Sequence, residues 1–171
     1  MMQRPIQGEY NPYFQAYIDL VPKGDFLDQL YKNTKSATDL FEKIPVEKHN
    51  YLYAADKWNV KELIMHMIDV ERVMCYRALV ASRGDNKTIL YGMDDHLYVI
   101  NAIVAGRLFN DLVEEFKAVR NATEKFFETI SEKQSKFVAN LDTQPITARA
   151  LGYIITGHTL HHLNGIKDNY L

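Results

Sequence analysis

The closing stretch of the chain, from Thr147 to Leu171, most constrains what this sequence can fold into. Its apolar residues recur at helical spacing, and a helical wheel of roughly 100° per residue places them on one face. His158 and His162 lie near the middle of that face, and His161 lies on its edge. Two imidazoles four residues apart on an inward face can bind one metal ion. The alternative is a pair of hydrogen-bonded core histidines, so a metal site needs a third ligand from elsewhere in the chain.

Three further stretches show the periodicity of amphipathic helices. The four predicted helices run from about Asp25 to Ile44, from Asn59 to Ser82, from Ala105 to Ile130, and from the N-cap Thr147 towards the C-terminus. A short helical piece near residues 95–100 precedes the third. No alternating strand pattern competes with them, and residues 83–95 and 131–146 are expected to be loops. Amphipathic helices of similar length joined by moderate loops predict an all-α fold, a four-helix bundle.

The predicted domain organisation is an irregular N-terminal arm, residues 1–24, followed by one bundle domain, residues 25–171. The arm is rich in proline, glycine and tyrosine, with a short helical turn expected around Phe14–Leu20. Such an arm is expected to pack its aromatic side chains across the bundle end, to line a site or to reach a partner subunit.

Composition excludes several classes of partner. The formal net charge is −2 and no basic patch is visible, which excludes nucleic acid and anionic membrane as expected partners. The single cysteine, Cys75, allows no intrachain disulfide and fits a reducing compartment. The N-terminus lacks the apolar run of a signal peptide, and no apolar stretch approaches the roughly 18 residues of a membrane span. The chain is therefore predicted to be cytoplasmic.

The helix from Asn59 to Ser82 supplies the candidate third ligand. His66 falls on the flank of its apolar stripe rather than at the centre, but a bundle helix touches two neighbours, so a flank position can face inward. Together with His158 and His162 it would give three neutral imidazoles. Such a set leaves a position on Zn²⁺, Ni²⁺ or a similar divalent ion open for water or substrate, as a catalytic site requires.

Two acidic residues on the same helix have alternative interpretations. Glu71 falls inside the apolar stripe, where it either orients a ligand histidine or acts as a base. The alternative, which we favour, is a buried carboxylate paired with an arginine or a tyrosine. Asp69 lies three residues from His66 and could orient it, but its position on the wheel favours a solvated face.

The remaining candidates have weaker support. Cys75 could be a soft ligand or nucleophile, but is better interpreted as a small buried hydrophobe. His161 could replace His162 through its spacing of three residues from His158. His49 and His96 lie in or beside predicted loops and are expected to be solvated, although His96 could approach the site from the loop before the third helix.

Two segments resemble the DinB/YfiT-like superfamily. The segment WNVKELIMHMIDVER, residues 58–72, resembles its second-helix signature, and ARALGYIITGHTLHH, residues 148–162, resembles its closing helix. Residues 76–79 and 112–120 resemble its DinB-like branch, and the likeness covers about residues 25–171. The resemblance implies a four-helix bundle, commonly a homodimer, with a divalent metal held by three histidines. Carried over by position, these are His66, His158 and His162.

The resemblance also implies candidate functions. The family includes metal-dependent transferases that add a low-molecular-weight thiol to electrophiles, a thiol-dependent isomerase, and proteins described as hydrolases. It therefore favours a metal-dependent thiol transferase or hydrolase with zinc or nickel as cofactor and a small molecule as substrate. The alternatives are a non-catalytic, stress-associated metal-binding module and a bundle whose histidines are structural. His96 and the N-terminal arm depart from the family pattern.

Overall fold

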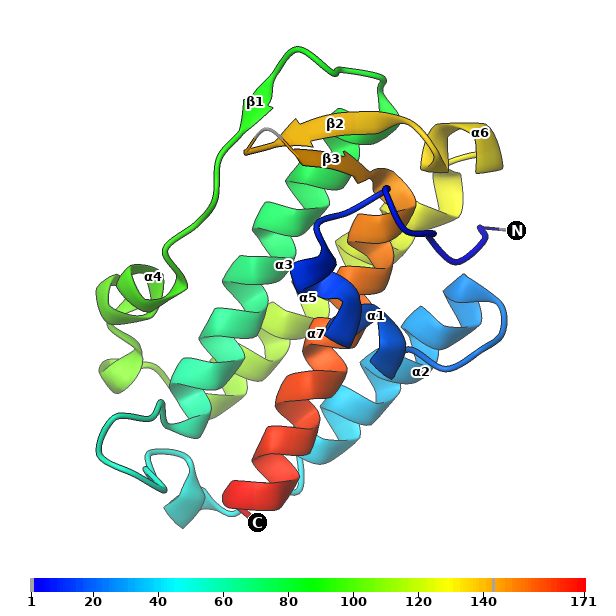
Figure 1. The fold of residues 1–171 in the computed structure, drawn as a ribbon. Coiled ribbons are helices and arrows are strands. Elements are labelled where there is room, and N and C mark those ends of the chain that lie inside the picture. The colour runs from blue at the N-terminus through cyan, green and yellow to red at the C-terminus, as the bar shows by residue number, and fades with distance from the viewer. Residues whose placement is uncertain (1, 143) are drawn as a thin grey trace.

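Four long helices form the frame of the computed structural model, which describes residues 2–142 and 144–171 (Figure 1). The helices are α2 (Phe26–Phe41), α3 (Val60–Ser82), α5 (Phe109–Thr129) and α7 (Ala148–Asn169). Shorter helices are α1 (Gln15–Leu20), α4 (Asp95–Ala102) and α6 (Glu132–Ser135). Met1 and Thr143, which fall in the predicted arm and in the predicted loop 131–146, lie outside the described residues. In the described part of the chain, no helix combines the length and apolar character that crossing a membrane requires.

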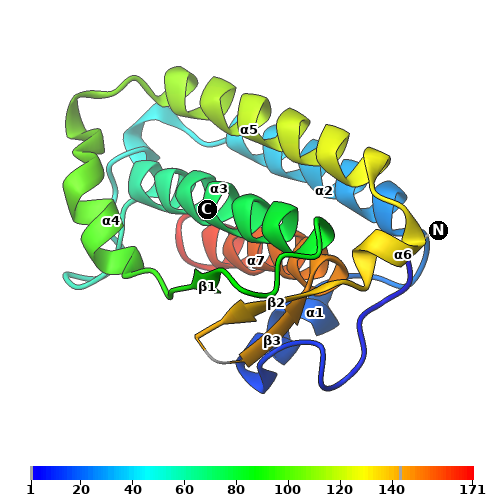
Figure 2. The ribbon, with the colours of Figure 1, turned by 90° about the horizontal axis from the view of Figure 1, so that it is seen from above.

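The long helices pack in a ring. Helix α3 contacts α7 and α5, and α2 contacts the same two helices from the other side. Seen from above, α2 and α5 form one layer, while α3 and α7 form the other (Figure 2). The prediction of an all-α four-helix bundle is confirmed, and α3 and α7, which carry the candidate ligands, are neighbours.

Local sequence signals fix where the site-bearing helices begin and end. Asn59 and Glu62 form a reciprocal capping box at the start of α3, with bonds of 3.0 and 2.8 Å. Helix α7 begins where the Thr147 hydroxyl accepts a hydrogen bond from the amide of Ala150, at 3.2 Å. Gly84 adopts a left-handed φ of 73° just past the end of α3, a conformation that glycine takes without steric cost.

A belt of polar side chains crosses the middle of the bundle. It separates two apolar clusters, one centred on residues such as Leu30, Met74 and Leu151, the other on Phe41, Ile64 and Phe116. The buried side chains of the belt are Asn33, His66, Glu71, Arg120, Thr123, Thr156, His158 and Thr159. Since buried polar groups are costly unless paired, the belt is where the bundle departs most from a purely apolar core.

Two predicted helix boundaries were wrong by a few residues. Helix α2 ends at Phe41 rather than Ile44, because the chain tightens into bonds from the amides of Lys43 and Ile44 to carbonyls three residues earlier. Helix α5 begins at Phe109 rather than Ala105, because Val104–Gly106 forms a 3₁₀ turn and Leu108 is extended. The predicted short helix before it is α4.

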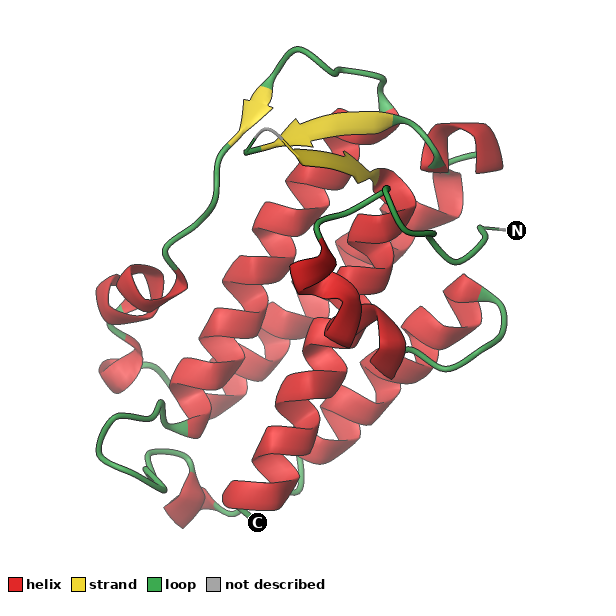
Figure 3. Ribbon diagram, in the orientation of Figure 1, coloured by secondary structure: helices red, strands yellow, loops and turns green. Residues whose placement is uncertain are grey.

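The expectation of two structureless loops was also wrong. Strands β1 (Ile89–Leu90), β2 (Val138–Leu141) and β3 (Gln144–Thr147) form a small sheet over one end of the bundle (Figure 3). Strand β2 pairs in parallel with β1 and antiparallel with β3. These strands are too short to show a clear alternation in the sequence, and β1 and β2 lie far apart along the chain, so periodicity could not identify them.

The N-terminal segment is folded against α7. A 3₁₀ turn at Pro12–Phe14 leads into α1, which lies along α7 in Figure 1. Glu9 accepts a hydrogen bond from Arg149 Nε at 2.7 Å, which ties the segment to the start of α7. A side chain at Gly157 would place its Cβ only 1.9 Å from the carbonyl oxygen of Tyr17. This glycine is therefore required for the close approach of the N-terminal segment, next to His158.

Candidate metal centre

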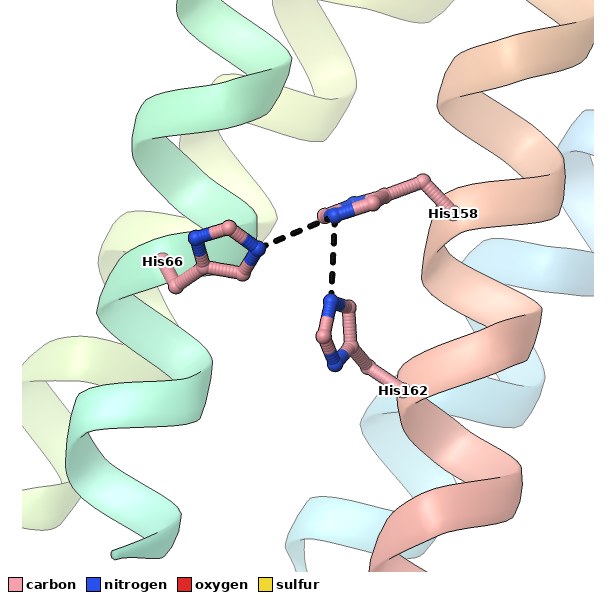
Figure 4. Close-up of side chains that lie close together, drawn as sticks. All are labelled: His66, His158 and His162. Carbon is pink, nitrogen blue, oxygen red and sulfur yellow. Dashed lines mark hydrogen bonds between the residues drawn. The ribbon is translucent and has the colours of Figure 1, made fainter. Parts of the chain in front are cut away.

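Three histidines meet between α3 and α7. His66 extends from α3 towards His158 and His162, which lie one turn apart on α7 (Figure 4). The Nε2 atom of His158 lies 3.0 Å from that of His66 and 3.0 Å from that of His162. One nitrogen from each of the three rings lies within 4.8 Å of the others. The flank position of His66 thus faces inward, because α3 packs against several neighbours.

The three histidines cannot satisfy the hydrogen-bonding needs of all their ring nitrogens by themselves. A neutral imidazole nitrogen carries either one proton or one lone pair, so the Nε2 of His158 cannot make good hydrogen bonds to both neighbours at once. In addition, His66 Nδ1 is buried and has no hydrogen-bond partner among the described residues. Three converging ring nitrogens, with no carboxylate oxygen within 4.0 Å of them among the described residues, are the arrangement expected around a cation.

Burial keeps these rings neutral. It lowers the pKa of His66 to about 4 and the pKa of His162 to about 3. It also lowers the pKa of His158 well below its usual value, and the neighbouring imidazoles act in the same direction. The neutral ring is the form that binds a metal, so the ligands need not lose protons near neutral pH.

The donor set fits a divalent transition metal. Zinc–nitrogen bonds of about 2.0–2.1 Å at tetrahedral angles separate the ligand nitrogens by about 3.3 Å. The two separations of 3.0 Å are within a few tenths of an ångström of that value. Three imidazoles suit zinc, nickel, copper or iron, whereas calcium and magnesium prefer oxygen ligands.

A cavity of about 340 Å³ opens onto His66 and His158. Its walls come from the N-terminal segment, from α3, and from the segments around Met93 and Asp142. The N-terminal residues in the wall are Asn11, Tyr13, Phe14 and Tyr17. A second cavity, of about 450 Å³, reaches His162 between Trp58, His96 and Tyr170. The histidine cluster is therefore accessible from two sides although two of its rings are buried.

The interpretation of Glu71 as a paired carboxylate is confirmed. Its Oε2 lies 2.7 Å from an Nη of Arg120, and both side chains are buried. Arg120 also donates hydrogen bonds of 2.8 Å each to Asn33 Oδ1 and to Thr159 Oγ1. Burial raises the pKa of Glu71, and the positive charge of Arg120 opposes this effect. Glu71 thus makes its closest charged contact with Arg120 rather than with a histidine of the cluster.

The other acidic and thiol candidates lie outside the cluster. Asp69 is partly exposed and lies 3.6 Å from Arg72. Its partial burial raises its pKa, and the charge of Arg72 opposes that rise. Cys75 is a free thiol of intermediate exposure, less buried than expected, and burial raises its pKa.

The remaining histidines lie outside the cluster. His161 is exposed and packs edge-on against Tyr17, at 5.5 Å between ring centroids. His49 is only partly exposed and stacks on Phe109, at 3.7 Å. His96 is exposed and faces Trp58 at 6.3 Å, so it contributes to the entrance of the second cavity rather than to the cluster.

Two cavity residues were missed by sequence analysis. Tyr17 was placed in an irregular arm, and only the glycine at position 157 hinted at a close neighbour for α7. Arg77 was noted only within a family-like segment. Its spacing of eleven residues from His66 puts both on nearly the same face of α3, which is a signal that a helical wheel contains.

Comparison with known proteins now establishes the family. The model of the DinB superfamily matches residues 29–166, so the chain belongs to this superfamily. A search of curated proteins found no match.

Solved structures share the fold at low sequence identity. YfiT from Bacillus subtilis, described as a probable metal-dependent hydrolase with an unusual four-helix bundle topology, matches with a TM-score of 0.73 and 12% identity, over 98% of this chain and 91% of its own. A mycothiol-dependent maleylpyruvate isomerase matches with a TM-score of 0.69 and 12% identity, over 87% of this chain and 62% of its own. The DinB-like protein YjoA from Bacillus subtilis matches with a TM-score of 0.61 and 19% identity, over 86% of this chain and 90% of its own.

Proposed function

We propose that the chain is a metal-dependent enzyme in which His66, His158 and His162 hold one divalent transition metal, zinc or nickel. The observation that carries this proposal is the convergence of three neutral ring nitrogens, two of them in rings that line one cavity and the third in a ring that lines another. A divalent ion with an open coordination position lowers the pKa of a bound water or thiol and so supplies a nucleophile near neutral pH.

We propose the transfer of a low-molecular-weight thiol to an electrophile as the reaction, with hydrolysis of a small molecule as the alternative. In the transfer, the thiol gives its proton to water and the sulfur forms a bond to the electrophilic carbon. The bond from that carbon to its leaving group breaks, and the leaving group departs into solvent with the electron pair. The histidines position the reaction, and Tyr17 and Phe14 shield it from solvent on one side. The thiol dependence of one structural neighbour and the hydrolase description of another support these two classes.

An activity screen tests the proposal. Protein loaded with zinc or nickel is incubated with pairs of thiols and electrophiles, and separately with ester and amide substrates. Turnover that disappears in the His158→Ala/His162→Ala variant supports the enzyme. Metal-loaded protein that converts no member of either panel contradicts it and favours the alternative of a non-catalytic metal-binding module.

We further propose that the protein is a homodimer, as its family resemblance implies. A two-fold contact through long helices is the simplest closed arrangement for two identical chains. Light scattering over a wide concentration range is expected to give twice the mass of the chain, and a monomer throughout that range would reject the dimer.

A further inference from the structure

Arg77 is a buried cation in the cavity that the proposed reaction leaves without a role. Its side chain is only 4% exposed, yet it lines the same cavity as His66 and His158. Eleven residues separate it from His66, which is close to three helical turns, so both side chains extend from nearly the same face of α3.

The protein uses few of the hydrogen-bond donors of Arg77. One Nη contacts the sulfur of Met74 at 3.4 Å, and the other donates to the carbonyl oxygen of Tyr91 at 2.5 Å. A guanidinium carries five N–H donors. Within residues 2–142 and 144–171, no carboxylate oxygen lies within 4.0 Å of its nitrogens. Burial lowers the pKa of Arg77, and the negative charge of Asp142 opposes this effect without forming an ion pair. A bound anion in direct contact would offset more of the cost of burying the charge.

The rim carboxylate whose charge acts on Arg77 makes its hydrogen bond elsewhere. Asp142 Oδ2 accepts a hydrogen bond of 2.8 Å from the amide of Gly92. Asp142 and Asp95, both exposed, belong to the same rim. Their negative charges disfavour a doubly charged phosphate and leave a singly charged carboxylate as the better partner for one guanidinium.

The surface between the two ends of the cavity is apolar. Val70 and Met74 lie on α3 between His66 and Arg77, and Ile154 faces them from α7. The guanidinium lies at the level of Met74, about 12 Å along the helix axis from His66. The cavity therefore has a cluster of metal-type ligands at one end, an apolar middle and a cation at the other end.

We propose that Arg77 binds a carboxylate group of the substrate whose reacting end lies at His66 and His158, so that the enzyme selects elongated, apolar molecules with a terminal carboxylate. This inference rests on the proposed function for the role of the histidine end. The binding of the acidic end is a separate property of Arg77 and can be measured by itself.

The competing explanation is structural, because Arg77 also anchors the carbonyl of Tyr91. A matched pair of ligands distinguishes this structural role from carboxylate binding. The probes are 8-mercaptooctanoate and 8-mercaptooctanamide, which share an extended chain and differ only in the charge at the end remote from sulfur. Calorimetric titration of zinc-loaded protein gives both dissociation constants for wild type, Arg77→Gln, Arg77→Lys and Asp142→Asn. Arg83→Gln, at the exposed end of the same helix, is the control for long-range charge.

Wild type is expected to bind the acid about tenfold more tightly than the amide, since hydrogen bonds to charged groups are stronger than neutral ones. Arg77→Gln is expected to abolish this preference and to leave amide binding unchanged, while Arg77→Lys retains part of it. Asp142→Asn, which preserves an acceptor for Gly92, is expected to strengthen binding of the acid alone. Arg83→Gln is expected to keep the full preference.

An equal preference for the acid in wild type and Arg77→Gln, or an equal loss of both ligands, overturns the inference. If Arg77→Gln does not fold, unchanged acid binding in Asp142→Asn overturns it instead. If neither thiol binds zinc-loaded protein, the proposed thiol transfer fails. Octanoate and octanamide titrated into metal-free protein then decide the role of Arg77 by the same comparison.

Discussion

The polar belt of the bundle has two halves of opposite character. In one half, the buried Glu71 and Arg120 neutralise each other, and Asn33 and Thr159 accept further hydrogen bonds from Arg120. In the other half, three histidines direct ring nitrogens at one another, and the described residues place no carboxylate oxygen within 4.0 Å of them. The two halves are adjacent, since Thr159 follows His158 on α7. The comparison teaches that burial of polar groups alone does not indicate a ligand site. Both halves contain buried atoms without a hydrogen-bond partner, among them Glu71 Oε1, Arg120 Nε and His66 Nδ1. What distinguishes the histidine half is that, within the described residues, no carboxylate forms an ion pair with its rings.

The largest expected effect is a loss of stability when the ion pair of the first half is broken. Glu71→Ala leaves Arg120 buried without its counter-ion, which is expected to lower the free energy of unfolding by about 3–5 kcal/mol. The double variant Glu71→Leu/Arg120→Met is expected to lose much less, because no lone charge remains. Denaturant unfolding provides the values, with Lys35→Ala, which removes an exposed ion pair, as a control of little effect. Metal content of Glu71→Ala protein that falls while stability is unchanged would contradict the division into halves.

The second effect concerns pH and the metal-free protein. The folded-state pKa of His66, about 4, lies below the ordinary value of 6.5, so the unfolded state binds more protons between these two pH values. The contribution of neutral His66 to stability is therefore fully present above pH 6.5 and is lost as the pH falls towards 4. For His66 alone the shift corresponds to about 3 kcal/mol. Denaturant unfolding across this range is expected to show a shallower pH dependence for His66→Leu than for wild type, and equal slopes would contradict the prediction.

The third effect tests the packing that encloses the histidine half. The Cβ of Gly157→Ala would meet the backbone of Tyr17 at 1.9 Å, so the N-terminal segment must move. The expected loss is about 1–3 kcal/mol in the free energy of unfolding. Limited proteolysis is expected to cleave the variant earlier within the first 24 residues. Gly165→Ala, where a Cβ has no neighbour within 4 Å, is the matched control on the same helix. Equal cleavage of both variants would show that the contact is not needed.

The smallest effect on stability is expected from removing one histidine of the cluster in metal-free protein. In metal-free protein, His162→Leu removes one of the two rings that compete for the Nε2 atom of His158. The free energy of unfolding should therefore stay unchanged or rise by about 1 kcal/mol. Thermal unfolding of both proteins after chelator treatment measures this. A clear loss of stability would mean that the cluster is a structural hydrogen-bond network, which is the alternative of a bundle with structural histidines.

Sequence reasoning reached the bundle because its signals are local. The caps at Asn59 and Thr147 and the glycine after α3 each act within a few residues, and the structure shows all three. His158 and His162 were identified for the same reason, since one helix carries both. The small sheet was missed because strand β1 pairs with a strand some 50 positions later, a contact that no local pattern specifies.

The parts of the site that depend on tertiary packing were less accessible. A single wheel placed His66 on a flank because it cannot represent a helix with neighbours on several sides. Tyr17 and Arg77 reach the cavity only because α1 lies on α7 and because the segment around Tyr91 packs beside α3. Their contacts with the cavity follow from how elements meet. For Arg77 the helical wheel shows only that it shares a face with His66, and not what that face contacts.

The most direct test of the central claim, that the unpaired histidine half holds a metal, is elemental mass spectrometry on untagged protein. Wild type is compared with His158→Ala/His162→Ala, and Glu71→Gln serves as a variant in the paired half. The account predicts about one equivalent of a transition metal in wild type and in Glu71→Gln, and none in the double histidine variant. Wild type that contains no metal even after incubation with Zn²⁺ or Ni²⁺ would contradict it.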